Sequence, residues 1–249
     1  MVPKPAAGRR VLVMVAGVGR EALPGCSVVL SRAELDWAAA IASDPDRARF
    51  VTGRALLRKM LGAQLGMAPG SVPLQQQGRG PVLLALPTDV RYSVAHGGAY
   101  VAVALARRPV GVDVEPVPTS VPDDVLVRRT CTPAEARTIL ARPAEERRGA
   151  YIELWVRKEA VIKASSTKLA LAEVDVHGSG LVTDATGHHW RAWPIPTDRS
   201  HRAVVVSTAR WAFAEPLKPK VLIAQCVGTA SNSGLATKSD QYSVMSLHH

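Results

Sequence analysis

Three acidic residues on two segments carry the first chemical signal in this sequence. Asp113 and Glu115 alternate with valines in Val110–Pro116, so strand periodicity places both carboxylates on one face, about 7 Å apart. Glu159 lies in Tyr151–Ala164, which has no internal Gly or Pro and is typical of a helix. Two such carboxylates repel each other unless a cation lies between them, and Mg²⁺ suits oxygen ligands of this kind. The pattern favours a hard divalent ion held between strand and helix, with a solvated strand face as the alternative.

The helix carries a second inward-facing charge, Lys163. Its apolar sector consists of Tyr151, Ile152, Leu154, Trp155, Val156 and Ile162. Glu159 and Lys163 fall within this sector, so both should point toward the element on which the helix packs. Glu153 and Arg157, four residues apart, instead form an ordinary exposed pair. A charge directed inward must find a partner. That partner is either a protein group, in a salt bridge that serves the fold, or a ligand.

Capping signals and apolar periodicity locate the elements that would position these residues. Ser31–Glu34 and Thr132–Glu135 have the Ser/Thr-x-x-Glu pattern of a capping box at the start of a helix. A longer helix is predicted from Asp44 to about Leu65. Besides the acidic strand, strands are predicted at Val174–His177, His188–Ala192 and Ala203–Thr208.

Two of these segments resemble the signatures of a known family. The motif Gly111-Val-Asp-Val-Glu115, followed about forty residues later by Trp155-Val-Arg-Lys-Glu-Ala-Val-Ile-Lys163, closely resembles the paired motifs of phosphopantetheinyl transferases of the surfactin-synthetase-activating type. The resemblance extends from about Asp46 to about Thr208. It implies an α+β fold of two pseudo-twofold lobes, with the active site between them. The implied enzyme moves the 4'-phosphopantetheine arm of coenzyme A to a serine of an acyl or peptidyl carrier protein and releases adenosine 3',5'-bisphosphate.

The resemblance also implies roles for the charged residues. Asp113, Glu115 and Glu159 would hold Mg²⁺, or Mn²⁺ in its place, on the pyrophosphate of coenzyme A. Lys163 and Lys158 would contact coenzyme A and balance charge that develops on the leaving group. Glu159 would take the proton of the serine, directly or through water. The implied catalytic set is therefore Glu159, Lys163 and Asp113.

The first long helix is predicted to bind the nucleotide end of coenzyme A. Its Asp-Arg-x-Arg-Phe motif is similar to the family helix whose arginine has that role, which implies Arg49 and, with it, Arg47. Arg54 is a further candidate on the same helix. We interpret Arg58 and Lys59 as part of a solvated basic face.

Two turns supply the remaining ligand candidates. Arg79 lies in a Gly-Arg-Gly-Pro turn, where backbone and a cation suit phosphate and adenine; the family has no glycine at the position of Gly80, and a plain hairpin is the alternative. His96 corresponds to the family histidine that contacts the ribose 3'-phosphate. Ala95 stands where the family has a serine, and a purely structural histidine is the alternative.

Composition narrows the classes of partner without choosing one. The chain has 249 residues, 47% of them hydrophobic, and a net charge of +10, so it can bury a core and attract nucleic acid, anionic membranes or acidic proteins. Its few aromatic residues, 4% in total, argue against a stacking platform for single-stranded nucleic acid. We therefore expect acidic carrier proteins as partners, no nucleic acid, no membrane and a monomer. A non-catalytic nucleotide-binding module and a basic nucleic-acid-binding protein remain the alternatives.

The sequence predicts two α/β halves, residues 1–109 and 110–214, followed by a disordered tail rich in polar residues, 215–249.

The apolar run Val11–Gly17 after two arginines superficially resembles a signal peptide. It is short and is followed closely by Arg20, so we interpret it as a core strand. The three cysteines are scattered along the chain, which fits a reducing cytoplasm.

Overall fold

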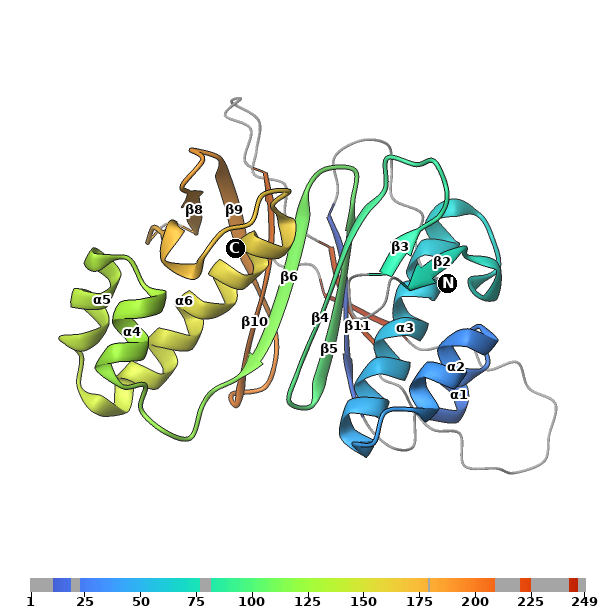
Figure 1. Ribbon diagram of the computed structural model, residues 1–249, viewed down its shortest axis with the longest axis horizontal. Helices are drawn as coiled ribbons and strands as arrows, with labels where there is room; N and C mark the ends of the chain where they lie inside the picture. The colour runs from blue at the N-terminus through green and yellow to red at the C-terminus, as the bar shows by residue number, and fades with distance from the viewer. Residues whose placement is uncertain are drawn as a thin grey trace.

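The computed structural model describes residues 11–18, 23–76, 82–178 and 180–208, together with the backbone of 220–224 and 242–245. Figure 1 shows two sheets side by side in the middle of the molecule, with helices on their outer sides. Helices and antiparallel strands both contribute, so the predicted α+β class is confirmed. Among the described residues, no helix is both long and apolar enough to span a membrane.

The first sheet has the strand order β12-β11-β1-β5-β4. Its strands are β1 (Leu12–Gly17), β4 (Arg91–Gly97), β5 (Tyr100–Ala106), β11 (Lys220–Ala224) and β12 (Tyr242–Met245). Around it lie α1 (Leu23–Ser27), α2 (Arg32–Ala39), α3 (Asp44–Leu65), the 3₁₀ turn η2 (Pro69–Ser71) and the small hairpin of β2 (Leu74–Gln76) and β3 (Val82–Leu84). The predicted helix from Asp44 to Leu65 is α3.

The second sheet has the order β6-β10-β9-β8-β7. Its strands are β6 (Val110–Pro116), β7 (Val174–Val176), β8 (Leu181–Asp184), β9 (His189–Ile195) and β10 (His201–Thr208). It is accompanied by α4 (Asp124–Thr130), α5 (Pro133–Leu140), α6 (Ala144–Ala164) and the 3₁₀ turn η3 (Leu171–Glu173).

The two sheets repeat one connectivity. In the first, β1 leads through α3 to β4 and β5, and β5 pairs antiparallel with both β1 and β4. In the second, β6 leads through α6 to β9 and β10, and β10 pairs antiparallel with both β6 and β9. This is an internal structural repeat that sequence similarity within the chain does not reveal.

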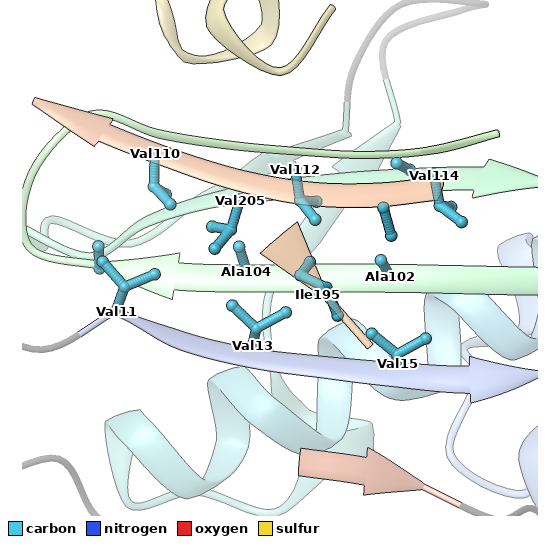
Figure 2. Close-up of a cluster of buried hydrophobic side chains, with 13 residues drawn as sticks. Val11, Val13, Val15, Ala102, Ala104, Val110, Val112, Val114, Ile195 and Val205 are labelled. Atoms are coloured by element: carbon cyan, nitrogen blue, oxygen red, sulfur yellow. The ribbon is translucent and has the colours of Figure 1, made fainter. Parts of the chain in front are cut away.

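The contact between the sheets is an apolar layer of small and β-branched side chains (Figure 2). It includes Val13 and Val15 of β1, Ala102 and Ala104 of β5, Val112 and Val114 of β6, and Val205 of β10. Because Val112 and Val114 point into this layer, strand alternation directs Asp113 and Glu115 to the other face of β6, as the sequence predicted. The backbone N–H of Val112 donates to the Ser93 hydroxyl oxygen (3.1 Å), which ties β6 to β4.

Helix α3 is anchored by a buried ion pair. Glu34, the capping-box glutamate of α2, lies 2.7 Å from the Arg58 Nε. The Arg58 side chain is 2% exposed, and its Nη1 donates to the carbonyls of Pro69 (3.1 Å) and Val72 (2.9 Å) around η2. The predicted solvated face was therefore wrong for Arg58, because a carboxylate and backbone carbonyls accept hydrogen bonds from its guanidinium inside the fold.

Helix α6 is anchored in the same way. Glu135, the capping-box glutamate of α5, lies 2.7 Å from the Lys158 Nζ. The Lys158 side chain is 1% exposed, and its Nζ also donates to the carbonyls of Leu171 (3.0 Å) and Val174, at either end of η3. Arg58 and Lys158 each lie fourteen residues beyond the first residue of their helix. The structural repeat thus extends to its buried charges.

The C-terminal segment differs in part from the prediction. Within the predicted disordered tail, 220–224 form β11, which pairs parallel with β1, and 242–245 form β12. The disorder prediction was wrong for these two segments, and the remainder of 215–249 lies outside the described residues. The apolar run at the other end forms β1, in line with its interpretation as a core strand.

Candidate active site

Close packing of α6 on β6 creates the candidate site. A Cβ atom at Gly111 would collide with the carbonyl oxygen of Ala160, so the helix reaches this position only because residue 111 has no side chain. The approach brings the end of α6 over the middle of β6. There the Lys163 Nζ lies 2.5 Å from the Asp113 Oδ1.

Asp113 is the deepest group of the site. Its side chain is 1% exposed, and burial raises the pKa of the carboxyl while Lys163 opposes the rise. Only one of its two oxygens is satisfied. Oδ2 is buried and has no hydrogen-bond partner among the described residues, which is costly for a carboxylate oxygen in a protein interior.

The other two predicted carboxylates lie close enough to act on Asp113 and on each other. Burial raises the pKa of Glu115 to about 7, and the charges of Asp113 and Glu159 add to the rise. Burial likewise raises the pKa of Glu159, with a further contribution from Asp113 and an opposing one from Lys163. The structure therefore brings Asp113, Glu115, Glu159 and Lys163 into one cluster, with two residues from the strand and two from the helix.

The first half of the chain adds two basic groups to this cluster, His96 of β4 and Arg49 of α3. A Cβ at Gly97 would collide with the carbonyl oxygen of Val114, so β4 lies directly against β6. Partial desolvation lowers the pKa of His96, and the positive charges of Arg49 and Lys163 lower it further. His96 thus lies between a residue of α3 and a residue of α6.

Arg49 reaches toward the same place from the second turn of α3. Its Nη1 donates to the carbonyl of Gly98 (3.0 Å), in the β4–β5 turn, and its Nη2 is paired with Asp46. Of the predicted nucleotide contacts, His96 therefore lies close enough to act on Asp113, and Arg49 close enough to act on His96.

The other predicted ligand residues lie elsewhere. The Arg47 guanidinium donates to the Ile41 carbonyl and pairs with Asp44 at 2.9 Å. Arg54 is buried near Glu34, at 3.4 Å. Lys158 was predicted to contact coenzyme A, but its ammonium is occupied inside the second half, so the structure contradicts that assignment. Arg79 lies outside the described residues.

The donor set matches Mg²⁺ in its chemistry but not in its arrangement. In the part of the chain that the structure describes, no three His, Cys, Asp or Glu side chains converge closely enough to hold a metal ion. Lys163 takes the place of a cation beside Asp113 Oδ1. Asp113 Oδ2 still lacks a donor, and the raised pKa values of Glu115 and Glu159 show that added positive charge would stabilise this cluster. The chemistry of the three residues, though not their spacing in this structure, therefore suits a hard divalent ion.

Two residues close to the site were not identified from the sequence. Asp198 lies in the β9–β10 turn and His201 is the first residue of β10. Both line a groove of about 290 Å³ beside α6, together with Val156, Arg157, Arg199 and Arg202. The Asp-x-x-His spacing is too common to have singled them out. Only the pairing of β10 with β6, which sets Arg202 opposite Glu115, shows that this turn borders the carboxylates.

Comparison with known proteins agrees with this site. A sequence profile of the 4'-phosphopantetheinyl transferase superfamily matches residues 109–209, which include β6 and α6. Among curated proteins, the 4'-phosphopantetheinyl transferase HetI of a Nostoc species is 29% identical over 160 residues, 62% of this chain and 67% of that protein. The 4'-phosphopantetheinyl transferase Sfp of Bacillus subtilis is 27% identical over 144 residues, 55% of this chain and 62% of that protein.

A third relative, the 4'-phosphopantetheinyl transferase psf-1 of Bacillus pumilus, is 28% identical over 119 residues, 47% of this chain and 50% of that protein. The matched segments thus span from one half to two thirds of these relatives. They support the interpretation made from the strand motif and the helix motif. The segment that carries Asp113, Glu115 and Glu159 is therefore similar to the 4'-phosphopantetheinyl transferase superfamily.

Proposed function

We propose that this protein transfers the 4'-phosphopantetheine arm of coenzyme A to a serine of an acyl or peptidyl carrier protein and releases adenosine 3',5'-bisphosphate. The observation that carries the proposal is the meeting of three carboxylates and Lys163 with Arg49 and His96 where β4 lies against β6. The basic residues suit the phosphates of coenzyme A, and the acidic residues suit a cation bound to its pyrophosphate.

In the proposed reaction the serine oxygen attacks the phosphorus that carries the pantetheine arm. A new P–O bond forms, the bond to the nucleotide phosphate breaks, and the serine loses its proton. Glu159 accepts that proton, since burial and Asp113 raise its pKa and so make it a stronger base than an exposed glutamate. Lys163, held by Asp113, stabilises the negative charge on the departing nucleotide phosphate.

Asp113, Glu115 and Glu159 would hold Mg²⁺, and the chemistry that this ion supplies is neutralisation of the pyrophosphate. Arg49 and His96 would bind the nucleotide end and thereby orient the reacting phosphorus. With a net charge of +10, the protein would attract an acidic carrier from solution, and the rate of encounter would fall with added salt. Monomeric state and cytoplasmic location remain predictions.

The test is mass spectrometry of a purified apo carrier protein after incubation with this protein, coenzyme A and Mg²⁺. We expect a mass gain of one phosphopantetheine on the carrier, and none when coenzyme A is omitted or when EDTA is added. The same incubation with a carrier whose acceptor serine is replaced by alanine is the matched control. If acyl and peptidyl carriers both stay unmodified while coenzyme A binds, the protein is a non-catalytic nucleotide-binding module instead.

A further inference from the structure

The two halves touch through a pair of hairpin turns that the proposed reaction does not use. The β4–β5 turn presents the backbone N–H of Ala99 to the Nε2 of His201, at 3.4 Å. Beside it, the Tyr100 hydroxyl donates to Asp198 Oδ2 (3.2 Å). The rings of Tyr100 and His201 also meet edge to face, with their centroids 4.8 Å apart.

His201 is held firmly in this position from its own side. Its Nδ1 lies 2.9 Å from Asp198 Oδ1 and 2.8 Å from the Ser200 hydroxyl. The residue is 7% exposed. Since Nε2 accepts from Ala99, we assign the ring proton to Nδ1, where it faces Asp198. The imidazole thus donates to Asp198 in the second half and accepts from the Ala99 backbone in the first half.

The turn that His201 holds is also the turn that positions Arg49. The carbonyl of Gly98 accepts the Nη1 hydrogen bond of Arg49 at 3.0 Å. Gly98 has a φ of 52°, and a Cβ there would collide with the His201 imidazole. Position 98 therefore needs glycine for two reasons, and its backbone cannot shift without losing the packing on His201.

We propose that His201 is a positioning residue. By holding the Gly98–Ala99 backbone, it fixes the carbonyl that orients Arg49, and so couples the second half to nucleotide binding by the first. The part that concerns coenzyme A rests on the proposed function above. The part that concerns the turn stands on the contacts alone.

The contact itself can be tested without any ligand. In His201→Asn the side chain can still face Asp198 but no longer reaches Ala99, whereas His201→Gln can place an oxygen acceptor near the former Nε2. We expect faster amide hydrogen exchange at Ala99 and Tyr100 in His201→Asn and largely restored protection in His201→Gln. The matched control is His188→Asn, in the turn before β9, where the side chain is 68% exposed.

The coupling can be tested by titration of coenzyme A in a calorimeter. We expect His201→Asn to weaken binding about tenfold, the lower end of the effect of a hydrogen bond to a charged group, and His188→Asn to leave it unchanged. In an Arg49→Ala background, His201→Asn should cause no further loss, because the two residues act through one route.

Several outcomes would overturn the proposal. Unchanged exchange at Ala99 in His201→Asn would show that the imidazole does not hold the turn. Faster exchange with unchanged affinity, or losses that add in the double variant, would show that the turn does not position Arg49. If His201→Asn fails to fold, His201→Gln decides, since it should bind coenzyme A nearly as well as the wild type. A wild-type protein that binds no coenzyme A would reject the proposed function, and the exchange result would then decide the role of His201.

Discussion

Helices α3 and α6 occupy equivalent places in the two halves and are anchored by the same device, yet they present different chemistry to the junction. Each has a buried cation paired with a capping-box glutamate, Arg58 with Glu34 and Lys158 with Glu135. The residue that follows the buried cation is Lys59 in α3, whereas in α6 it is Glu159. The repeat therefore preserves the buried ion pair that anchors each helix. The candidate site residue Glu159 lies at a position where the two halves differ.

The buried anchor Lys158 and the site residue Lys163 differ in how many hydrogen-bond partners surround the ammonium group. Lys158 has a carboxylate and two carbonyls around its ammonium and is 1% exposed. Lys163 is 34% exposed and pairs with Asp113, whose second oxygen has no hydrogen-bond partner among the described residues. A charge with all its hydrogen bonds made inside the fold stabilises the fold. A charged side chain whose hydrogen bonds are not all satisfied within the protein can bind a ligand.

We expect the largest loss of transfer activity at Glu159 of α6, and no loss at Lys59, the equivalent position of α3. Glu159→Gln removes the group that accepts the serine proton, so we expect transfer to a carrier to fall about 10³-fold. The melting temperature should stay close to that of the wild type, because Glu159 has no buried partner comparable with that of Lys158. Lys59→Gln, at the equivalent position of α3, is the control and should transfer normally. Loss of folding in Glu159→Gln would instead favour a structural salt bridge.

The shared anchor predicts stability losses in both halves. Lys158→Met removes the cation paired with the buried Glu135, so the free energy of unfolding should fall by about 3–5 kcal/mol, as measured in urea. Arg58→Met should cost less, because Glu34 keeps Arg54 at 3.4 Å. Folded Lys158→Met should bind coenzyme A as the wild type does. Weakened binding at unchanged stability would restore Lys158 to the ligand site. The double variant with Glu135→Leu should recover much of the lost stability.

The approach of α6 to β6 can be disturbed through one methyl group. Gly111→Ala inserts a Cβ where the Ala160 carbonyl lies, so we expect the free energy of unfolding to fall by about 1–3 kcal/mol. Transfer should fall too, because the helix that carries Lys163 is displaced from Asp113. Gly149→Ala is the control on the same helix. A Cβ at that position meets nothing within 4 Å, and the variant should gain about 0.5–1 kcal/mol. Equal effects of the two substitutions would exclude close packing as the role of Gly111.

The smallest effect concerns the turns where the halves meet. Hydrogen bonds from His201 and Ser200 lower the pKa of Asp198 from its ordinary 3.8 to about 2. Since the folded pKa lies below the unfolded one, the ionised carboxyl stabilises the fold above pH 3.8, and this contribution is lost as the pH falls toward 2. Asp198→Asn should therefore have a lower urea midpoint than the wild type at pH 6, with a difference that vanishes near pH 2. A difference independent of pH would show that the charge of Asp198 is not involved.

Local signals in the sequence were sufficient for much of the fold. The capping boxes at Ser31 and Thr132 and the extent of α3 follow from side-chain to backbone bonding within a few residues. The alternation around Asp113 correctly assigned the two faces of β6, because a strand has a period of two whatever lies next to it. The prediction from helical periodicity of which charged side chains of α6 face inward was less reliable. It marked Glu159 and Lys163 as the inward charges, whereas the fully buried one is Lys158.

The sequence by itself indicated the resemblance to the transferase family, the acidic strand and the helix that packs on it, since these depend on residue types at short spacing. Only the tertiary structure decided which cations serve the fold and which face the junction. Arg58 and Lys158 are buried because glutamates and carbonyls distant in the chain surround them. His201 reaches Ala99 across about a hundred residues of sequence. Such partners come together through the packing of two sheets, and no local pattern encodes that geometry.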